Sequence, residues 1–274
     1  MLGSLTLAAS LAALPSFIIA SPNSFPSPSD GFSCAKAIGQ VSCHATSPVN
    51  PDSYGTCCYN GALAPGNKES GLVLSTQFYN LTTGPPDSFT IHGLWPDYCD
   101  GTYPQFCSAQ SGIPEKSGEQ IEALIQEYDP SLLAYMRTYY ENEPSFWEHE
   151  YNKHGTCFST LRAKCQLDLS PYINQTSAAV VGYFQQIVHE FKQLPSYDWL
   201  AQAGITPDST KTYKLIDIQN ALAKKHGGVP YVGCYNGVLS EIWYFFNVRG
   251  PLIHGQYLPV ESTTNSSCPA DVSY

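Results

Sequence analysis

Residues 144–155, PSFWEHEYNKHG, and residues 91–96, IHGLWP, together predict a domain that combines helices with strands. The first segment opens with a proline, which fits the first turn of a helix, and reaches Gly155, at which a helix can end. The second belongs to a run over residues 89–95 that alternates apolar and polar side chains, as a strand does, until a glycine and a proline interrupt it. His92 therefore lies near the end of a predicted strand.

Further elements follow in irregular order on both sides of these segments. Strand-like residues lie at 72–78 and 238–248, and helical spacing lies at 117–127, 131–141, 177–193 and 215–226. Ser117 is a predicted N-cap, and Pro130 and Pro144 mark helix boundaries. Because the order shows neither a regular βαβ alternation nor a repeat, we predict an α+β fold. Composition shows no linker after residue 31, so we predict a single domain over residues 32–274.

The N-terminal segment is apolar and uncharged. Its first 29 residues contain no Lys, Arg, Asp or Glu, and residues 2–20 are mostly Leu, Ala, Phe and Ile. This pattern predicts a secretory signal peptide over residues 1–20, with cleavage near Ala20. A transmembrane anchor is the alternative, but polar residues and Pro15 interrupt the run, which is also short for a bilayer span. Residues 21–31, rich in Ser and Pro, are predicted to form a flexible leader.

Ten cysteines, an even number, predict five disulfides and an oxidising compartment. The adjacent Cys57 and Cys58 are expected to pair with two different parts of the chain. Glycosylation tripeptides begin at Asn80, Asn174 and Asn265, which are predicted to carry glycans on the secretory route. Together with the apolar N-terminal segment, these features predict a secreted protein.

The formal net charge of the chain is -10 at pH 7, which argues against a protein that binds nucleic acid through a broad basic face. A polyanionic ligand would have to meet local cations instead. The seven histidines supply such cations below neutral pH, where carboxylates also begin to take up protons.

The histidine-rich end of the first segment gathers charged groups on one side of the predicted helix. Glu150 and His154 are four residues apart, as are His149 and Lys153, so both pairs lie along one broad side. A zinc site of the metalloprotease type needs two histidines four residues apart. His149 and His154 are five apart, about 140° round the helix, which excludes that site. A solvated helix face with ordinary salt bridges remains the other interpretation.

Two imidazoles, a carboxylate and an ammonium that act without a metal suit the cleavage of RNA. A neutral His removes the proton of the ribose 2′-OH, whose oxygen attacks the phosphorus, and a protonated His gives a proton to the departing 5′-oxygen. A Lys and a further protonated His stabilise charge on the phosphoryl oxygens. DNA lacks the 2′-OH and is excluded as a substrate by this chemistry.

Residues 91–96 and 146–157 resemble the two active-site segments of the ribonuclease T2 family, the secreted acid ribonucleases of fungi, plants and animals. The resemblance, which includes the cysteine pattern, extends from Cys34 to Cys268 and points to the fungal branch. It implies an α+β fold with a central antiparallel sheet flanked by several helices. It also implies cleavage of single-stranded RNA with low base specificity, through 2′,3′-cyclic phosphates to 3′-phosphates.

The resemblance assigns the chemical steps to five residues. His154 would be the general base and His92 the general acid. Glu150 and Lys153 would stabilise the pentacovalent phosphorane, and His149 would bind phosphate.

Five further residues match the family's two base sites. Trp95, Asp97 and Tyr103 match the site for the base 5′ to the cut, where an aromatic ring stacks on the base and the carboxyl of Asp97 favours adenine. Phe146 would stack on the following base, and Gln77 would join it in that second site.

The resemblance also implies one pairing out of the 945 that ten cysteines allow. The implied disulfides are Cys34–Cys58, Cys43–Cys99, Cys57–Cys165, Cys107–Cys157 and Cys234–Cys268.

We further expect a monomer that needs no cofactor or metal, does not cleave DNA, and is free of the membrane once the signal peptide is removed. Its expected location is extracellular, or else a vacuole or lysosome.

Two other functions compete with a ribonuclease. A secreted recognition protein could keep the same fold as a binding scaffold, because fold and function are separable. The second is a metal-dependent hydrolase, which would lose activity in a chelator.

The histidines outside the two segments are expected to lie in the core or on the surface rather than in the site. They are His44, His189, His226 and His254.

Overall fold

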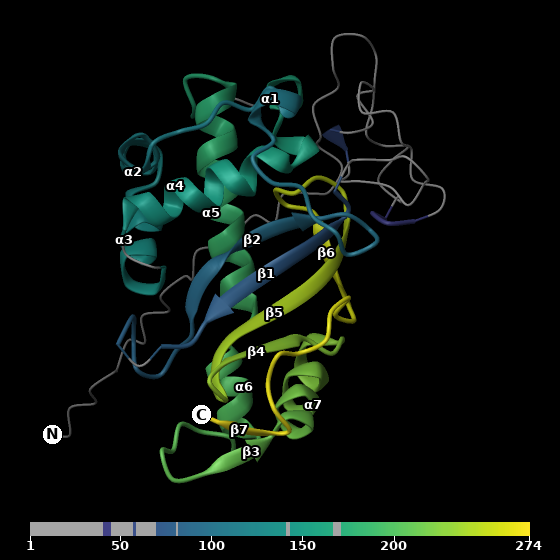
Figure 1. Cartoon of the computed structure of the whole chain (residues 1–274). Helices are drawn as coiled ribbons and strands as arrows, with labels where there is room; N and C mark the ends of the chain where they lie inside the picture. Colours follow the sequence, from purple (N-terminus) through teal and green to yellow (C-terminus); the bar gives the residue numbers. More distant parts are fainter. Residues whose placement is uncertain (1–40, 45–56, 59–69, 81, 141–142, 167–170) are drawn as a thin grey trace, which may run out of the picture.

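The computed structural model describes residues 41–44, 57–58, 70–80, 82–140, 143–166 and 171–274 (Figure 1). The predicted signal peptide (residues 1–20) and leader (21–31) lie outside these ranges. The strands are β1 (Leu72–Phe78), β2 (Thr90–Asp97), β3 (Thr212–Lys214), β4 (Tyr231–Tyr235), β5 (Val238–Arg249), β6 (Gln256–Val260) and β7 (Asp271–Ser273). The α-helices are α1 (Ser108–Ser111), α2 (Gly118–Tyr128), α3 (Pro130–Tyr139), α4 (Pro144–Lys153), α5 (Gln175–Gln193), α6 (Ser196–Gln202) and α7 (Leu215–His226). Short 3₁₀ turns follow α4 at η3 (Gly155–Cys157), η4 (Ser159–Leu161) and η5 (Ala163–Cys165).

The strands form one sheet in the order β2-β1-β5-β7-β3, and β4 and β6 also pair with β5. Helices α2 to α5 gather at one end of this sheet and α6 and α7 at the other (Figure 1). The pairs between these strands are antiparallel, apart from a short parallel contact between Val238 of β5 and Ser273 of β7. The predicted α+β fold with a central antiparallel sheet is therefore confirmed, with one parallel contact added.

The two faces of the sheet have different surroundings. One face, which we call the core face, is covered by α5 and carries Ile91 and Leu94 into the main hydrophobic core. The other, which we call the open face, carries a smaller apolar cluster in which Leu74 packs with Trp95 and Trp243. Successive strand residues point to opposite faces, so Leu94 packs in the main core and its neighbour Trp95 lies on the open face.

Local signals in the sequence set several helix ends. The side chain of Ser117 accepts a hydrogen bond from the backbone of Gln120, whose side chain bonds back to Ser117, so the predicted N-cap is part of a full capping box. The predicted end of α4 is wrong, because the helix ends at Lys153 and His154 is its C-cap. Gly155 instead begins a 3₁₀ turn, where a Cβ would lie only 2.8 Å from Cδ2 of Tyr151. Close packing, not helix capping, requires glycine there.

Four disulfides join the described residues, and they are four of the five that the resemblance implies. They are Cys43–Cys99, Cys57–Cys165, Cys107–Cys157 and Cys234–Cys268. The fifth expected pair includes Cys34, which lies outside the described residues. Cys99 follows β2 and Cys157 follows α4, so disulfides fix the chain just beyond both motif segments.

In the described ranges, no helix is both long enough and apolar enough to span a bilayer.

Candidate active site

A β-bulge in β2 turns His92 toward the open face. Thr76 of β1 pairs with Gly93, but the next residue, Gln77, pairs with Ile91, so His92 has no partner across the ladder. Such an extra residue breaks the alternation and re-aims a side chain. Ile91 keeps its place in the core, and the imidazole of His92 lies on the open face, 4.7 Å from the ring of Trp95 between centroids.

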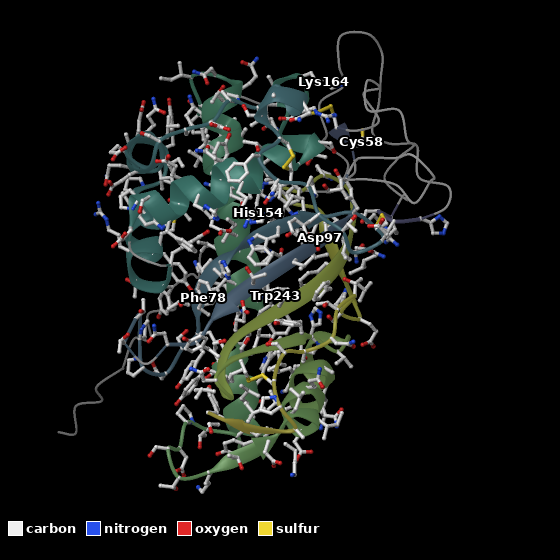
Figure 2. The ribbon with its side chains drawn as sticks, viewed as in Figure 1. Cys58, Phe78, Asp97, His154, Lys164 and Trp243 are labelled. Carbon is white, nitrogen blue, oxygen red and sulfur yellow. A yellow bond between two sulfur atoms is a disulfide. The ribbon has the colours of Figure 1, made fainter. Side chains whose placement is uncertain are left out.

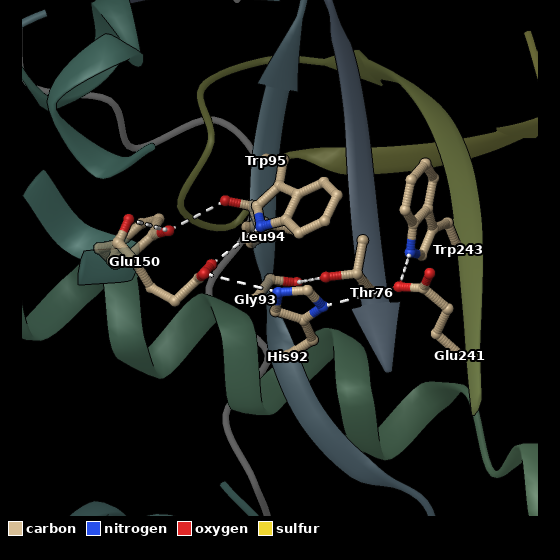
Figure 3. Close-up of polar contacts among 9 residues, drawn as sticks. Thr76, His92, Gly93, Leu94, Trp95, Glu150, Glu241 and Trp243 are labelled. Carbon is tan, nitrogen blue, oxygen red and sulfur yellow. Dashed lines mark hydrogen bonds and ion pairs between the residues drawn. The ribbon is translucent and has the colours of Figure 1, made fainter. Parts of the chain in front are cut away.

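Gly93 allows the helix to approach this strand. A Cβ at Gly93 would lie 2.0 Å from Oε2 of Glu150 and 2.9 Å from the indole nitrogen of Trp95. Because the glycine leaves this space, Glu150 on α4 reaches β2 and its Oε2 accepts a hydrogen bond of 2.8 Å from Nε1 of Trp95. The two motif segments thus meet through a carboxylate that is 1% exposed (Figure 3).

The imidazole of His92 lies between two carboxylates. Its Nε2 is 3.7 Å from Oε1 of Glu150, and its Nδ1 is 4.0 Å from Oε2 of Glu241 on β5 (Figure 3). The ring of Phe78 stacks on it, with centroids 3.7 Å apart. Burial, together with the charges of Lys153 and His149, lowers the pKa of His92 to about 3.

His154 is buried against Trp95. The indole stacks on its ring at a centroid distance of 4.9 Å, and neither imidazole nitrogen has a hydrogen-bond partner. Burial lowers the pKa of His154 well below its ordinary value, and the charges of Lys153 and His92 add to this. An imidazole in this setting is neutral and has free nitrogens, as a proton acceptor requires.

The remaining charged residues of α4 complete the cluster. Burial raises the pKa of Glu150 to about 8, although the hydrogen bond from Trp95 and the charge of Lys153 oppose the rise. His149 is exposed, and its ring lies 6.3 Å from that of Phe106 and 6.5 Å from that of Phe146. Of the two pairs predicted to share one broad side of the helix, Glu150 and His154 are turned inward and buried, whereas His149 is turned outward and exposed.

The other side of α4 fixes the helix to its neighbours. Oε2 of Glu148 accepts a hydrogen bond from the backbone of Gly118 at the start of α2, and the Asn152 amide bonds to both backbone groups of Lys116. Trp147 and Tyr151 lie in the main core. These residues of the motif therefore position the helix that carries the charged cluster.

A cavity of about 340 Å³ adjoins Lys153 and His154 on the open face. Trp95, Asp97 and Tyr103, the residues predicted for the first base site, all line it. Figure 2 shows Asp97, His154 and Trp243 along strands β1, β2 and β5. Burial raises the pKa of Asp97 to about 7, so its carboxyl is protonated at acidic pH. A flat ring could stack there and exchange hydrogen bonds with this carboxyl.

A second aromatic group lies on the other side of His92. The ring of Phe146 is 5.7 Å from His92 and 6.3 Å from Phe78 between centroids. Phe146 was predicted for the second base site, whereas Phe78 was not singled out from the sequence. Its position two residues beyond Thr76 in the same strand is the signal that could have placed it on the open face.

Gln77 is not brought to this site. It lies in the core, where its Nε2 donates to the carbonyl of Leu194 at 2.9 Å and its Oε1 accepts from Ser196 at 2.6 Å. Its side chain points away from the face that carries His92, because it follows Thr76 in the strand. We therefore correct the expectation that Gln77 joins the second base site.

Two residues of β5 lie at the site, although the sequence predicted only a strand there. Glu241 and Trp243 are two apart and lie on the open face, where Nε1 of Trp243 donates to Oε2 of Glu241 at 2.8 Å (Figure 3). Neither belongs to a recognisable motif, and their proximity to His92 depends on the pairing of β5 with β1. Among the described residues, no three His, Cys, Asp or Glu side chains are grouped so that they could hold a metal ion.

A family model and individual relatives both match this chain. The model of the ribonuclease T2 family matches residues 52–255. Ribonuclease T2 of Aspergillus oryzae is 46% identical over 246 residues, covering 86% of this chain and 80% of that protein. Ribonuclease Trv of Hypocrea rufa is 44% identical over 241 residues, covering 85% of this chain and 94% of that protein.

Solved structures share the fold. The crystal structure of Actibind, described as a T2 ribonuclease, matches with a TM-score of 0.72 and 42% identity, covering 85% of this chain and 94% of that one. RNase NT, solved in complex with 5′-AMP, matches with a TM-score of 0.54 and 21% identity, covering 76% of this chain and 98% of that one. At that identity, the second match speaks for the fold only.

Proposed function

This chain belongs to the ribonuclease T2 family and is an endoribonuclease of that type, and we propose that it cleaves single-stranded RNA by transphosphorylation at the cluster around His92 and His154. The observation that carries the proposal is that the buried imidazole of His154 and the half-buried imidazole of His92 both have unpartnered nitrogens beside Glu150 and Lys153. Buried polar atoms without partners are rare, and in a cleft they are suited to meet a substrate.

His154 acts as the general base in this proposal. It takes the proton of the ribose 2′-OH, and the freed oxygen attacks the adjacent phosphorus. Because burial and the neighbouring cations lower its pKa, His154 stays neutral at acidic pH, where an ordinary His would be protonated.

His92 acts as the general acid. It gives a proton to the 5′-oxygen as the bond between that oxygen and phosphorus breaks, which leaves a 2′,3′-cyclic phosphate. The low pKa of His92 in the free enzyme rises when a phosphodiester anion lies beside it, since an opposite charge favours the protonated ring. Low pH increases the protonated fraction further, so the reaction should be fastest in acid.

Glu150, Lys153 and His149 stabilise charge on the phosphoryl oxygens in the transition state. Lys153 is near enough to lower the pKa values of all three histidines, so its ammonium acts throughout the cleft. Glu150 is protonated at acidic pH because burial raises its pKa, and a neutral carboxyl can donate a hydrogen bond to a phosphoryl oxygen.

The bases flank the scissile bond on two aromatic surfaces. The base 5′ to the cut occupies the cavity lined by Trp95, Asp97 and Tyr103, and the next base stacks on Phe146, with Phe78 beside it. Stacking accepts every base, which agrees with low base specificity, while Asp97 adds a preference for adenine.

The test is a pH-rate profile on adenosine-uridine dinucleotides in the presence of a chelator. We expect a bell shape with an acidic maximum, cyclic phosphate followed by 3′-phosphate products, and rates that the chelator leaves unchanged. Absence of these products would instead favour a recognition protein with the same fold, and inhibition by the chelator would favour a metal-dependent hydrolase.

Secretion and glycosylation also belong to the proposal. The asparagines of the three predicted glycosylation sites, Asn80, Asn174 and Asn265, are exposed, and a disulfide-rich domain suits an extracellular or vacuolar location. We expect the mature enzyme to be a monomer that begins near residue 21. Mass spectrometry of the protein from culture medium would identify its first residue and its glycans.

A further inference from the structure

The Nδ1 atom of His92 faces a carboxylate that the proposed reaction does not use. This nitrogen is buried and has no hydrogen-bond partner, and Oε2 of Glu241 lies 4.0 Å from it. The other nitrogen, Nε2, faces Glu150 and is the one available to the substrate. The imidazole thus has one reacting side and one side that is directed at β5 (Figure 3).

Neighbouring residues hold Glu241 in this place. The indole of Trp243 donates to Oε2 of Glu241, which fixes the carboxylate on the open face. Opposite it in the ladder stands Gly233, where a Cβ would lie 2.3 Å from Cγ of Glu241. The glycine therefore leaves the space that the side chain of Glu241 fills. The carboxylate is 22% exposed, so water screens its effect on His92 only in part.

We propose that Glu241 is a positioning residue that accepts a hydrogen bond from Nδ1–H of His92 and so holds Nε2 toward the departing 5′-oxygen of the substrate. This inference rests on the proposed role of His92 as general acid. The hydrogen bond of one imidazole nitrogen sets which nitrogen carries the proton and how the ring is turned. A small rotation of the imidazole would bring Nδ1 from 4.0 Å to hydrogen-bond distance of Glu241.

The charge of Glu241 also opposes the other charges that face His92. Lys153 and His149 on α4 lower the pKa of His92, and Glu150 on the same helix is mainly neutral in acid because burial raises its pKa. Burial also raises the pKa of Glu241 on β5, but its side chain is more exposed than that of Glu150, and in its ionised form it favours the protonated ring. When it is itself protonated, its carbonyl oxygen still accepts the hydrogen bond.

Two substrates separate this role from a structural one. In RNA the 5′-oxygen is a poor leaving group that needs a proton from His92 as its bond to phosphorus breaks. In a nucleoside 3′-(p-nitrophenyl phosphate) the 2′-oxygen attacks in the same way, but nitrophenolate leaves without a proton. Loss of general acid catalysis therefore slows RNA cleavage and spares the nitrophenyl ester.

The experiment compares Glu241→Ala, Glu241→Gln and His92→Ala on both substrates, with Glu261→Ala as a control in which an exposed carboxylate is removed. For Glu241→Ala we expect kcat on RNA to fall about 10- to 100-fold, part of the ~10²–10⁴ that a general acid contributes, with the nitrophenyl ester cleaved at close to the normal rate. Glu241→Gln keeps an acceptor and should recover much of the rate. The basic limb of the pH-rate profile of this variant should move to lower pH, because the lost negative charge no longer favours protonated His92.

The outcomes distinguish this inference from the proposed function. If His92→Ala slows both substrates equally, His92 is not the general acid, and the role of Glu241 falls with it. If His92→Ala spares the ester but Glu241→Ala slows both substrates, or neither, then Glu241 does not position the acid. An effect of Glu241→Gln on KM alone, without a moved basic limb, would equally overturn the inference. Thermal unfolding of each variant checks that the domain is folded.

Discussion

The proposed catalytic cleft, which comprises the cavity beside His154 and the cluster around His92, contains the same kinds of residues as a second cavity on the core face. The second cavity, about 370 Å³ in volume, is lined by residues that include His189, Glu190, Trp199, Lys225 and His226. The cleft is lined by Trp95, Lys153 and His154, and Glu150 is bonded to Trp95. Burial raises the pKa of Glu190 to about 7 and lowers that of His226 to about 4, much as it shifts Glu150 and His92. Neither composition nor a shifted pKa distinguishes the two places.

The arrangement of the charged groups does distinguish them. In the cleft, Lys153 acts on the pKa values of both His92 and His154, so the groups lie within electrostatic range of one another. In the second cavity, Glu190 is bonded to Gln186, and the ring of His226 packs on Tyr244 and Phe246. A reaction needs several groups that converge on one point. The charges that act on the pKa of His189 belong to His254 and Lys192, which do not line the second cavity.

The largest expected effect comes from the two histidines that are proposed to be catalytic. His92→Ala and His154→Ala should each lower kcat/KM on RNA by about 10²- to 10⁴-fold, because each removes one proton-transfer role. The matched change in the second cavity, His189→Ala, should leave kcat/KM within about twofold of wild type. Steady-state kinetics on a dinucleotide measures all three. Similar losses of kcat/KM in all three variants would show that the second cavity matters as much for catalysis as the cleft.

Gly93→Ala tests whether the close approach of helix and strand is needed. A Cβ at residue 93 would lie 2.0 Å from Oε2 of Glu150, so the carboxylate must move. We expect kcat to fall about 10²-fold, as for loss of one transition-state donor, with the protein still folded. The double variant with Glu150→Ala should be little worse than Glu150→Ala alone, since both changes remove the same contact. Additive losses would show that Gly93 acts in another way.

Asp97→Asn tests the base preference at the cavity wall. Below pH 7 the Asp97 carboxyl is protonated because burial raises its pKa to about 7, and it can both donate to adenine and accept from it. An Asn amide pairs with adenine in the same manner. We expect wild type to lose several-fold of its adenine preference as the pH rises from 5 to 8, and the variant to keep its preference. Competition between dinucleotides at each pH measures this, and parallel curves would contradict it.

Glu190→Gln should change stability and not catalysis. The pKa of Glu190 is about 7 in the folded state and about 4.5 unfolded, so the folded state holds its proton more tightly. Its contribution to the free energy of unfolding is complete below pH 4.5 and is lost as the pH rises through 7. Relative to wild type, the variant should gain about 3 kcal/mol between pH 4.5 and pH 8, with kcat/KM on RNA unchanged. Urea unfolding at both pH values provides the measurement, and a constant difference would refute it.

Some elements could be predicted because their signals are local. The strand at residues 72–78 and the helix at residues 215–226 match the structure at both ends, since apolar periodicity and boundary residues set them. Gly155 was misjudged as a helix cap because the reason for glycine there is contact with a side chain of the preceding turn. Gln77 was misplaced because the face of β1 that carries the site is the face of Thr76, and this depends on the pairing of β1 with β2.

The sequence by itself determined which residues can carry out the chemistry and which local element each one occupies. Hydrophobic spacing builds β2 and α4, and the motif gives His92, Glu150, Lys153 and His154 their order along the chain. Only the tertiary structure decided that the bulge turns His92 to the open face. It also decided that Glu241, 149 positions later in the chain, faces Nδ1 of His92. The physical reason is that spacing within one element is fixed by its own geometry, whereas contacts between elements depend on strand register and on how closely a helix can approach.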